Sequence, residues 1–344
     1  MNYNLAFIGF GNIGKGFAEL LLEQEKQLKE KYAIEYKVVA ISTLTRGTVY
    51  NKNGLNLKEI LKLIQKEGTL TNHCDVKKGW DTLKTIKDSN ADIVLELTPT
   101  NIKTGDPAIK HIETALLSKK NVITVNKGPI ALKYKQLINI AQKNKVMLKF
   151  EGTVLGGTPA ITLGTEALAG AKITEIKGIL NGTTNFILTE MEKGRDYKSA
   201  LKEAQKLGYA ETDPTADVEG YDTVAKLVIL ANVLMNANIK PSDVKRTGIT
   251  KISLANIKKA RQNGQVWKLV GHIKTDNGIE AEVAPKMLNS NELLANINKG
   301  MNGLCIKTDI VGEITIIGAG AGPKGTSFAI LNDLISINRT LKGI

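Results

Sequence analysis

The residues best suited to proton transfer are an aspartate and a lysine near the start of an apolar segment. Asp222 and Lys226 lie four residues apart where the pattern predicts a helix, so both project from one face and can pair. The residues that follow, Leu227 to Leu234, are apolar all round, which is typical of a buried helix. A lysine buried beside a carboxylate can act as a general acid and base. The alternative is an ion pair that only anchors the helix.

The densest polar cluster in the chain comes just before this helix. Five carboxylates stand between positions 211 and 222, namely Glu211, Asp213, Asp217, Glu219 and Asp222. Packed together they would repel one another unless a cation, such as a substrate ammonium group, lay among them. The cluster therefore favours a substrate that carries an amino group.

A second pattern, GFGNIG, begins at Gly9 and predicts a turn that binds a dinucleotide. It follows a predicted strand, Asn4 to Ile8, and precedes a predicted helix, Lys15 to Lys31. In such a turn Gly9 permits the tight bend, Gly11 lets the backbone approach a pyrophosphate, and Gly14 lets the helix pack on the strand. The helix N-terminus then offers free N–H groups to the phosphates. An ordinary glycine-rich turn is the alternative.

The second predicted strand, Glu35 to Ile41, bears on the choice between NAD and NADP. In NAD enzymes this strand usually ends in an acidic residue that holds the ribose 2′-hydroxyl. Here the chain continues Ser42-Thr43-Leu44-Thr45-Arg46, which supplies hydroxyls and a cation where a 2′-phosphate would lie. We therefore expect NADP, with NAD possible and with Arg46 as a plain surface residue the alternative.

Two further predicted strands, Ala91 to Leu97 and Asn121 to Val125, end in polar segments. Ligands of open α/β sheets bind beyond the carboxyl ends of the strands. We therefore expect residues 98–101 and 126–129 to face the cofactor, with Lys127 at a strand end. A helix is expected from about Thr104, and a strand over 145–150 completes the strand–helix alternation.

These patterns predict an α/β fold: a Rossmann, doubly wound parallel sheet and a mixed α+β catalytic domain. The expected boundaries are 1–150, 151–317, and a glycine turn and helix over 318–344 that return to the nucleotide domain. In the second domain we expect strands over 173–180, 266–274, 280–285, 305–309 and 313–317. The Gly/Thr-rich loop 151–159 is either a hinge or a cation site built from Glu151 and backbone carbonyls.

The composition argues against several other classes of protein. The net charge is +13, but lysines are spread along the chain and aromatic residues make up 5%, so no nucleic-acid partner is expected. No apolar run reaches the ~20 residues that cross a bilayer, and no secretion signal precedes the first strand, which indicates a cytoplasmic protein. The two cysteines, Cys74 and Cys305, and the three scattered histidines predict neither disulfide nor metal site.

Taken together, these segments resemble the homoserine dehydrogenases. The matching motifs run in order through nearly the whole chain: GFGNIG, ELTPTN, ITVNKGP, EGTVLGGTP, GILNGTTNFIL, EAQKLGYAETDPTADVEGYDTVAKLVILA and GAGAG. The stretch from Gly178 to Ala231 is the most specific. The resemblance implies reversible oxidation of L-homoserine to L-aspartate 4-semialdehyde in threonine, methionine and isoleucine biosynthesis. It also implies a homodimer formed through the sheet of the second domain.

The resemblance assigns roles residue by residue. Lys226 corresponds to the acid–base lysine, Lys127 to a second lysine at the reacting oxygen and cofactor, and Asp222 to its catalytic carboxylate. The substrate contacts it implies are Glu211, Asp217, Asp222, Thr183 and Tyr209. The cofactor contacts we expect are Gly9, Gly11, Asn12, Ile13, Gly14, Thr43, Arg46, Thr98, Pro99, Thr100, Lys127 and Gly322. A sodium-like monovalent cation is expected at Glu151, Val154, Gly156 and Thr158.

The chain departs from the family pattern in two places, and two other functions stay open. The acidic residue after the second strand is missing, and Leu155 replaces a small residue in the cation loop. Only one helix fits after Gly322, so we expect no regulatory module and no inhibition by threonine. The alternatives are an aspartate or diaminopimelate type of dehydrogenase, which should lack the 211–226 cluster, and a non-catalytic cofactor-sensing regulator, which could dispense with Lys226.

Overall fold

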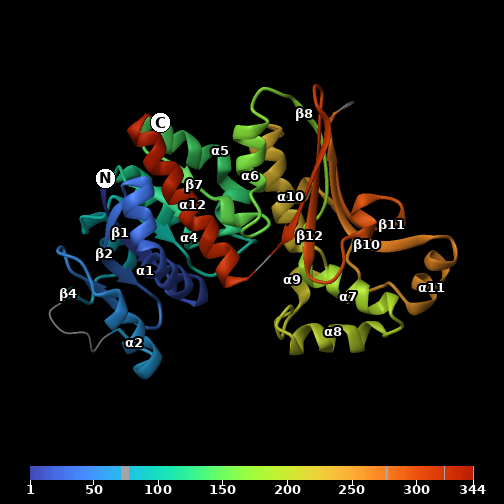
Figure 1. The fold of residues 1–344 in the computed structure, drawn as a ribbon, viewed down its shortest axis with the longest axis horizontal. Helices are drawn as coiled ribbons and strands as arrows, with labels where there is room; N and C mark the ends of the chain where they lie inside the picture. The colour runs from blue at the N-terminus through green and yellow to red at the C-terminus, as the bar shows by residue number, and fades with distance from the viewer. Residues whose placement is uncertain (71–76, 276–277, 321, 344) are drawn as a thin grey trace. The chain divides into compact units, whose positions relative to one another are not determined.

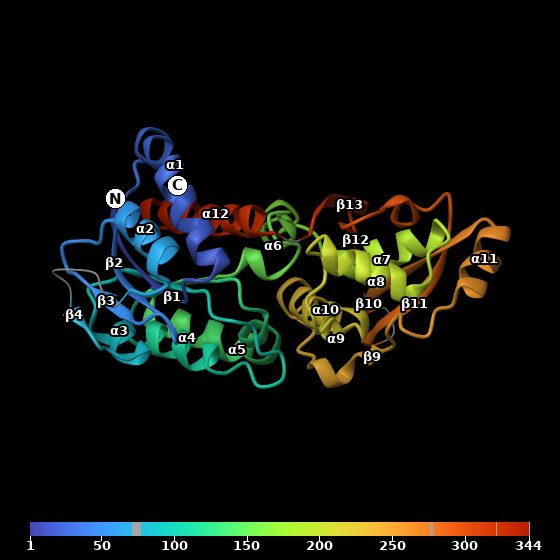
Figure 2. The ribbon, with the colours of Figure 1, turned by 90° about the horizontal axis from the view of Figure 1, so that it is seen from below.

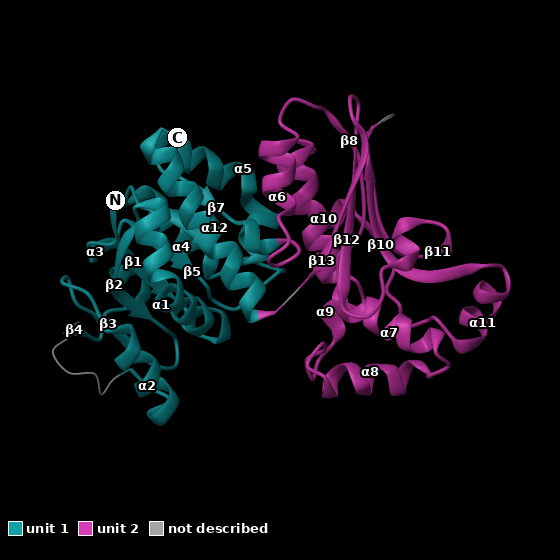
Figure 3. Ribbon diagram, viewed as in Figure 1, with its two compact units in different colours: residues 1–153, 323–344 teal, residues 154–322 magenta. Residues whose placement is uncertain are grey.

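The computed structural model describes residues 1–70, 77–275, 278–320 and 322–343. They form two compact units, Met1–Thr153 with Pro323–Ile344 and Val154–Gly322 (Figure 3). The chain therefore leaves unit 1 once and returns to it. Cys74 and His73 lie outside the described residues.

Unit 1 is built on a seven-stranded sheet in the order β4-β3-β2-β1-β5-β6-β7. Five of these strands, from β2 to β7 in that order, are parallel, which confirms the predicted Rossmann fold. Strand order reverses between β1 and β5, and ligands of such sheets bind at this switch point. The parallel strands are β1 (Asn2–Ile8), β2 (Glu35–Ser42), β5 (Ile93–Glu96), β6 (Asn121–Thr124) and β7 (Leu148–Lys149).

The edge of this sheet is antiparallel, which the sequence did not predict. Strand β3 (Thr48–Tyr50) turns back against β2, and β4 (Lys77–Lys78) pairs with β3. Both strands are too short to show alternation of apolar and polar residues. The sequence pattern therefore had nothing from which to predict them.

Helices cover the sheet of unit 1. They are α1 (Asn12–Tyr32), α2 (Leu57–Glu67), α3 (Thr82–Asp88), α4 (Ala108–Leu117) and α5 (Lys127–Asn144). Helix α4 begins four residues later than the expected start at Thr104. The segment before α4 contains a turn in which the side chain of Asn101 accepts hydrogen bonds from the backbone of Lys103 and Thr104. Asparagine favours such a turn over a helix.

The C-terminal helix α12 (Pro323–Lys342) lies alongside α1 in unit 1 (Figures 1 and 2). Its side chains Ile330 and Leu334 belong to the same buried cluster as Phe7 of β1 and Phe17 of α1. Asn338 fixes its register, because its amide nitrogen donates to the carbonyl of Tyr32 at 3.0 Å. Helix α12 is thus part of the core of unit 1.

Unit 2 contains a six-stranded sheet in the order β13-β12-β8-β10-β11-β9. It is antiparallel except at the β9 edge. All of the strands predicted for this domain exist, several of them longer than predicted. Their bounds are β8 (Ile173–Ile179), β9 (Lys245–Arg246), β10 (Gln265–Lys274), β11 (Glu280–Asn289), β12 (Met301–Thr308) and β13 (Gly312–Ala319).

The helices of unit 2 position the polar cluster found in the sequence. Every residue of α10 from Asp222 to Ala231 is buried, as the apolar residues after Lys226 predict. Gly271 of β10 allows this close packing, because a Cβ there would lie 3.3 Å from Thr223 and 3.7 Å from Leu227. The helices of the unit are α6 (Ala160–Thr162), α7 (Gly182–Glu192), α8 (Tyr197–Lys206), α9 (Thr215–Val218), α10 (Tyr221–Leu234) and α11 (Leu254–Gln262).

Within the described part of the chain, no helix is both long and apolar enough to span a membrane.

Candidate active site

The predicted ion pair forms at the start of α10. The Nζ of Lys226 lies 2.7 Å from Oδ2 of Asp222, and both residues are buried. The same ammonium donates to the carbonyl oxygen of Leu180, again at 2.7 Å. An ammonium has three protons, so two are directed by these contacts and one is left for another acceptor. The geometry therefore suits proton exchange with an oxygen presented to Lys226.

Asn181, which directly precedes α7, holds the carboxylates of this site. Its amide nitrogen donates to Oδ1 of Asp217 at 2.6 Å and to Oδ2 of Asp222 at 2.9 Å. Its carbonyl oxygen accepts from the backbone N–H of Thr184 and so caps α7. One side chain thus starts a helix and brings two like charges together. No local sequence pattern pointed to the two distant aspartates.

The pKa of Asp217 is raised in this cluster. Burial disfavours the ionised carboxylate, and the neighbouring Asp222 raises the pKa further, while the hydrogen bond from Asn181 opposes both effects. A raised pKa in a cluster of this kind shows that the free protein holds the charge of Asp217 at an energetic cost. A positively charged ligand would remove this cost.

The remaining predicted substrate residues divide into two groups. Thr183 is buried and donates through Oγ1 to the backbone oxygen of Tyr209 at 2.6 Å. The ring of Tyr209 stacks on Phe186 at 4.6 Å between centroids. Glu211, in contrast, is exposed, and Gln205 contacts it only through its backbone carbonyl at 3.1 Å. Hydrogen bonds and the ion pair therefore connect Asp217, Asp222 and Lys226 with Asn181 at the start of α7. Thr183 of the same helix is connected to Tyr209. The side chain of Glu211 lies outside this hydrogen-bond network.

In unit 1 the glycine turn has the geometry that a pyrophosphate requires. Gly9 has a φ of +94°, and a Cβ there would lie 2.6 Å from the carbonyl oxygen of Leu97. A Cβ at Gly14 would lie 3.0 Å from the carbonyl oxygen of Gly9. At Gly11, however, a Cβ would meet no described atom within 4 Å, so protein packing does not explain this glycine. It leaves room at the N-terminus of α1, as close approach of a phosphate demands.

The segment after β2 brings Arg46 to this turn. A guanidinium nitrogen of Arg46 donates to the carbonyl oxygen of Phe10 at 2.7 Å. The hydroxyl of Thr43 accepts from the backbone N–H of Arg46 and donates to Gly47, which shapes the loop. Arg46 is therefore held at the glycine turn, and its contact with a 2′-phosphate stays a prediction.

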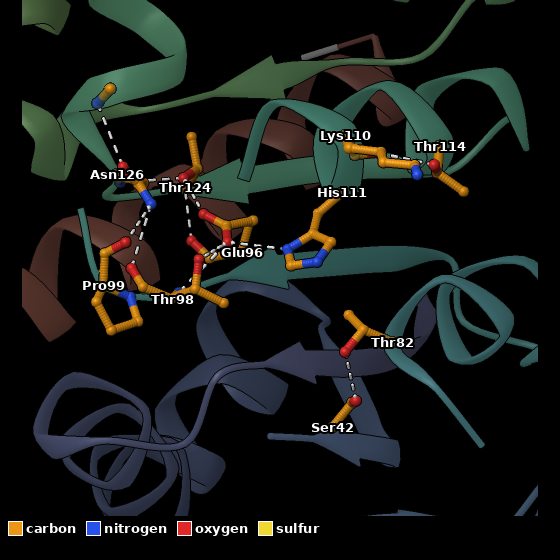
Figure 4. Close-up of polar contacts among 11 residues, drawn as sticks. Ser42, Thr82, Glu96, Thr98, Pro99, Lys110, His111, Thr114, Thr124 and Asn126 are labelled. Atoms are coloured by element: carbon orange, nitrogen blue, oxygen red, sulfur yellow. Dashed lines mark hydrogen bonds and ion pairs between the residues drawn. The ribbon is translucent and has the colours of Figure 1, made fainter. Parts of the chain in front are cut away.

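Two neighbouring strand ends in unit 1 are joined by Asn126 (Figure 4). Its amide nitrogen donates to the carbonyls of Thr98 at 3.2 Å and Pro99 at 3.4 Å, both beyond the end of β5. Its side-chain oxygen accepts from Gly128 and caps α5, whose first residue is Lys127. A cation is unfavourable at this positive end of a helix. The stability of α5 therefore does not account for Lys127. The sequence placed Asn126 in the segment 126–129 that faces the cofactor, but it did not predict the contacts of Asn126 with Thr98 and Pro99.

The structure gives less support for the contacts predicted at the cation loop and at the closing glycine turn. Glu151 belongs to unit 1, and Val154, Gly156 and Thr158 belong to unit 2, so the cation site stays a prediction. Leu155 adopts a left-handed backbone with a φ of +57°, which is costly for any residue but glycine. Among the described residues, no group of three or more His, Cys, Asp or Glu side chains could hold a metal ion. Thr100 and Gly322 are exposed, and their cofactor contacts stay predictions.

Comparisons with known proteins agree with this geometry. A family model described as "Homoserine dehydrogenase, NAD binding domain" matches residues 9–151, and one described as "Homoserine dehydrogenase" matches residues 159–335. The chain is 44% identical to a homoserine dehydrogenase of Methanocaldococcus jannaschii, over 98% of this chain and 99% of the relative. The chain belongs to the homoserine dehydrogenase family.

Further members of this family resemble the chain over its full length. An NAD(+)-dependent homoserine dehydrogenase of Pseudomonas canavaninivorans is 41% identical, over 98% of this chain and 97% of that one. A crystal structure of a putative homoserine dehydrogenase from Archaeoglobus fulgidus aligns with a TM-score of 0.89 at 34% identity, covering 98% and 99% of the two chains. A hyperthermophilic archaeal homoserine dehydrogenase in complex with NADPH aligns with a TM-score of 0.84 at 29% identity, covering 99% and 98%. As a member of the homoserine dehydrogenase family, the chain is an oxidoreductase.

The raised pKa of Asp217 predicts how stability depends on pH. The folded protein holds the Asp217 proton to a higher pH than the unfolded chain does, so this group lowers stability as pH rises through the window between the two pKa values. We expect Asp217→Asn to unfold at a higher temperature than wild type at pH 7, with a difference that shrinks toward pH 4.5. Thermal unfolding followed by circular dichroism measures it.

Asp213→Asn is the matched control for this prediction. Hydrogen bonds from Thr215 lower the pKa of Asp213, so its ionised form favours the folded state above the unfolded pKa. The control should therefore lower the midpoint of unfolding at pH 7. Identical midpoints for Asp217→Asn and wild type at neutral pH would contradict the assignment.

Proposed function

We propose that the chain catalyses reversible oxidation of L-homoserine to L-aspartate 4-semialdehyde with NAD or NADP. The observation that supports this most directly is the buried Asp222–Lys226 pair at 2.7 Å, next to a second carboxylate, Asp217, with a raised pKa. Such a site provides a proton carrier and negative charge for a substrate ammonium group. The family of the chain and its glycine turn supply the rest of the argument.

Proton transfer is assigned to Lys226. In the oxidative direction its neutral amine accepts the hydroxyl proton of homoserine as the carbinol carbon loses a hydride and becomes an aldehyde. In the reductive direction the ammonium returns this proton to the aldehyde oxygen. Bound nicotinamide supplies the hydride acceptor or donor. Asp222 and the carbonyl of Leu180 orient Lys226 in both directions.

The other residues bind and orient the substrate in this proposal. Asp217 and Asp222 attract its ammonium group, and Asn181 keeps the two carboxylates in register. Thr183 and Tyr209 are assigned further substrate contacts. Glu211 is exposed and outside the hydrogen-bond network, so its assignment as a substrate contact rests on its match to the family motif. Lys127 is assigned to the reacting oxygen and the nicotinamide end of the cofactor.

Substitution of Lys226 tests the reaction. We expect Lys226→Met to lower kcat for NADPH-dependent reduction of aspartate semialdehyde by about 100-fold or more, because a positioned acid–base group contributes roughly this much. Lys193→Met is the control, since Lys193 is a solvent-exposed lysine of the same unit paired with Glu190. Unchanged turnover in Lys226→Met, with the control also unchanged, would exclude the role of Lys226.

We further propose that NADP is the preferred cofactor. Arg46 lies against the glycine turn, and guanidinium groups bind phosphate in charge-assisted, often bidentate pairs. Helix α1 follows Gly11 and has no acidic residue in its first turn, so no carboxylate in that turn repels a phosphate. Relatives of both kinds exist, one named as NAD(+)-dependent and one solved with NADPH.

Arg46→Ala tests this preference. The ratio of kcat/KM for NADPH to that for NADH should fall about tenfold, since only the phosphorylated cofactor loses a partner. Any effect on the glycine turn itself weakens both cofactors and cancels in the ratio. Arg339→Ala, an exposed arginine of α12, should leave the ratio unchanged. A ratio that Arg46→Ala does not alter would contradict NADP preference.

We propose a homodimer formed through the sheet of unit 2. Met301 of β12 and Ile317 of β13 lie on one face of the sheet, because Ile317 pairs with Gly303, two residues along from Met301. They are 38% and 53% exposed, which is high for apolar side chains on a sheet.

Sedimentation equilibrium should give twice the mass of the chain, and a mass that stays monomeric at micromolar concentration would refute the dimer.

A further inference from the structure

Glu96 is a fully buried carboxyl group at the end of the central strand β5. A carboxyl group is costly to bury unless it is hydrogen-bonded, and an apolar residue would fill this position in a strand whose other residues are apolar. Figure 4 shows the side chains that surround it. The hydroxyl of Thr98 contacts Oε1, the hydroxyl of Thr124 lies 3.2 Å from Oε2, and Nδ1 of His111 lies 3.4 Å from Oε1.

These contacts continue outward to the strand ends. The Thr124 hydroxyl oxygen accepts the backbone N–H of Asn126 at 3.0 Å. The amide nitrogen of Asn126 donates to the carbonyls of Thr98 and Pro99. The hydrogen bonds therefore form a closed ring, Glu96–Thr124–Asn126–Thr98, which ties the end of β5 to the end of β6.

Lys127 is attached directly to this ring. Asn126 caps α5 by accepting from Gly128, and Lys127 stands between these two residues. A Cβ at Gly128 would lie 2.4 Å from the carbonyl oxygen of Asn101, so the start of α5 packs tightly against the segment after β5. The position of the Lys127 backbone thus depends on the same contacts that hold Thr98 and Pro99.

We propose that Glu96 is a positioning residue for the dehydrogenase reaction, acting through the ring to place Lys127 and the Thr98–Pro99 segment. The inference rests on the proposed function, in which these residues serve the reacting oxygen and the nicotinamide. Glu96 itself touches neither substrate nor cofactor. Misplacement of a catalytic group by about 1 Å costs up to 100-fold in rate, so a buried anchor below the strand ends has a large effect on turnover.

The competing explanation is that Glu96 only stabilises the fold. His111 belongs to α4 and is buried, so the Glu96–His111 contact also fastens this helix to the sheet. A purely structural role would lower the temperature of unfolding and leave the turnover of the folded enzyme unchanged. A positioning role changes turnover at temperatures where every variant is folded.

The first experiment uses Glu96→Gln in the full chain. Glutamine keeps the size of the side chain but replaces one acceptor oxygen with a donor, so it disturbs the ring without opening a cavity. We expect kcat for aspartate semialdehyde to fall about tenfold. The Kd for NADPH, measured by its fluorescence without substrate, should change less than about threefold, because the Gly9–Gly14 turn and Arg46 are untouched. An unchanged kcat would overturn the proposal.

A double-mutant cycle identifies the residue through which Glu96 acts. In a Lys127→Met background the effect of Glu96→Gln on kcat should shrink to less than about threefold, since the group to be positioned is gone. The same tenfold loss in both backgrounds would overturn the proposal. A wild-type enzyme without activity on aspartate semialdehyde would instead refute the proposed function, so the two failures are distinguishable.

Thr124→Val gives an independent test if Glu96→Gln folds poorly. It removes only the hydroxyl that links Glu96 to Asn126, and we expect the same loss of kcat and the same dependence on Lys127. The matched control is Thr85→Val, since Thr85 is fully buried in α3 and its hydroxyl donates to Asp81 at 2.7 Å, away from the ring. Equal kcat losses in the two threonine variants would show a general packing effect and overturn the proposal.

Discussion

The contact between Lys226 and Asp222 determines what the surrounding elements of unit 2 must do. A lysine and an aspartate are almost never buried unless they are paired, and here the pair sits at the first turn of a helix that is otherwise apolar. Helix α10 must therefore pack closely on the sheet, the end of β8 must bring the carbonyl of Leu180 to the ammonium, and α7 must begin at Asn181. The second carboxylate, Asp217, then gives the site one negative charge more than Lys226 can balance.

Unit 1 positions its predicted ligand contacts through backbone groups. Its predicted ligand contacts come from strand ends and helix starts, where backbone groups lack partners. The glycine turn leaves N–H groups of α1 available, and Asn126 fixes the start of α5. Polar side chains that satisfy each other below the strand ends, Glu96 and Thr124 among them, hold these backbone groups in place.

Much of this arrangement could be predicted from the sequence because the signals are local. The spacing of Asp222 and Lys226, the glycines from Gly9 to Gly14, and the apolar strands each define an element within a short window. The antiparallel β3 and β4 were missed because they are too short to show a period. Asn181 and Glu96 were missed as site residues, and the contacts of Asn126 with residues 98 and 99 were not predicted, because the partners are distant in sequence. Asn181 lies 36 and 41 positions from the two aspartates it joins, and only the folded chain shows such a pairing.

The return of α12 to unit 1 has a consequence for synthesis of the chain on the ribosome. Ile330 and Leu334 complete the same buried cluster as Phe7 and Phe17, yet they are translated after the whole of unit 2. While unit 2 is being translated, the apolar side chains of unit 1 that α12 covers still lack this cover. The core of unit 1 is therefore complete only after residues 323–342 have been synthesised.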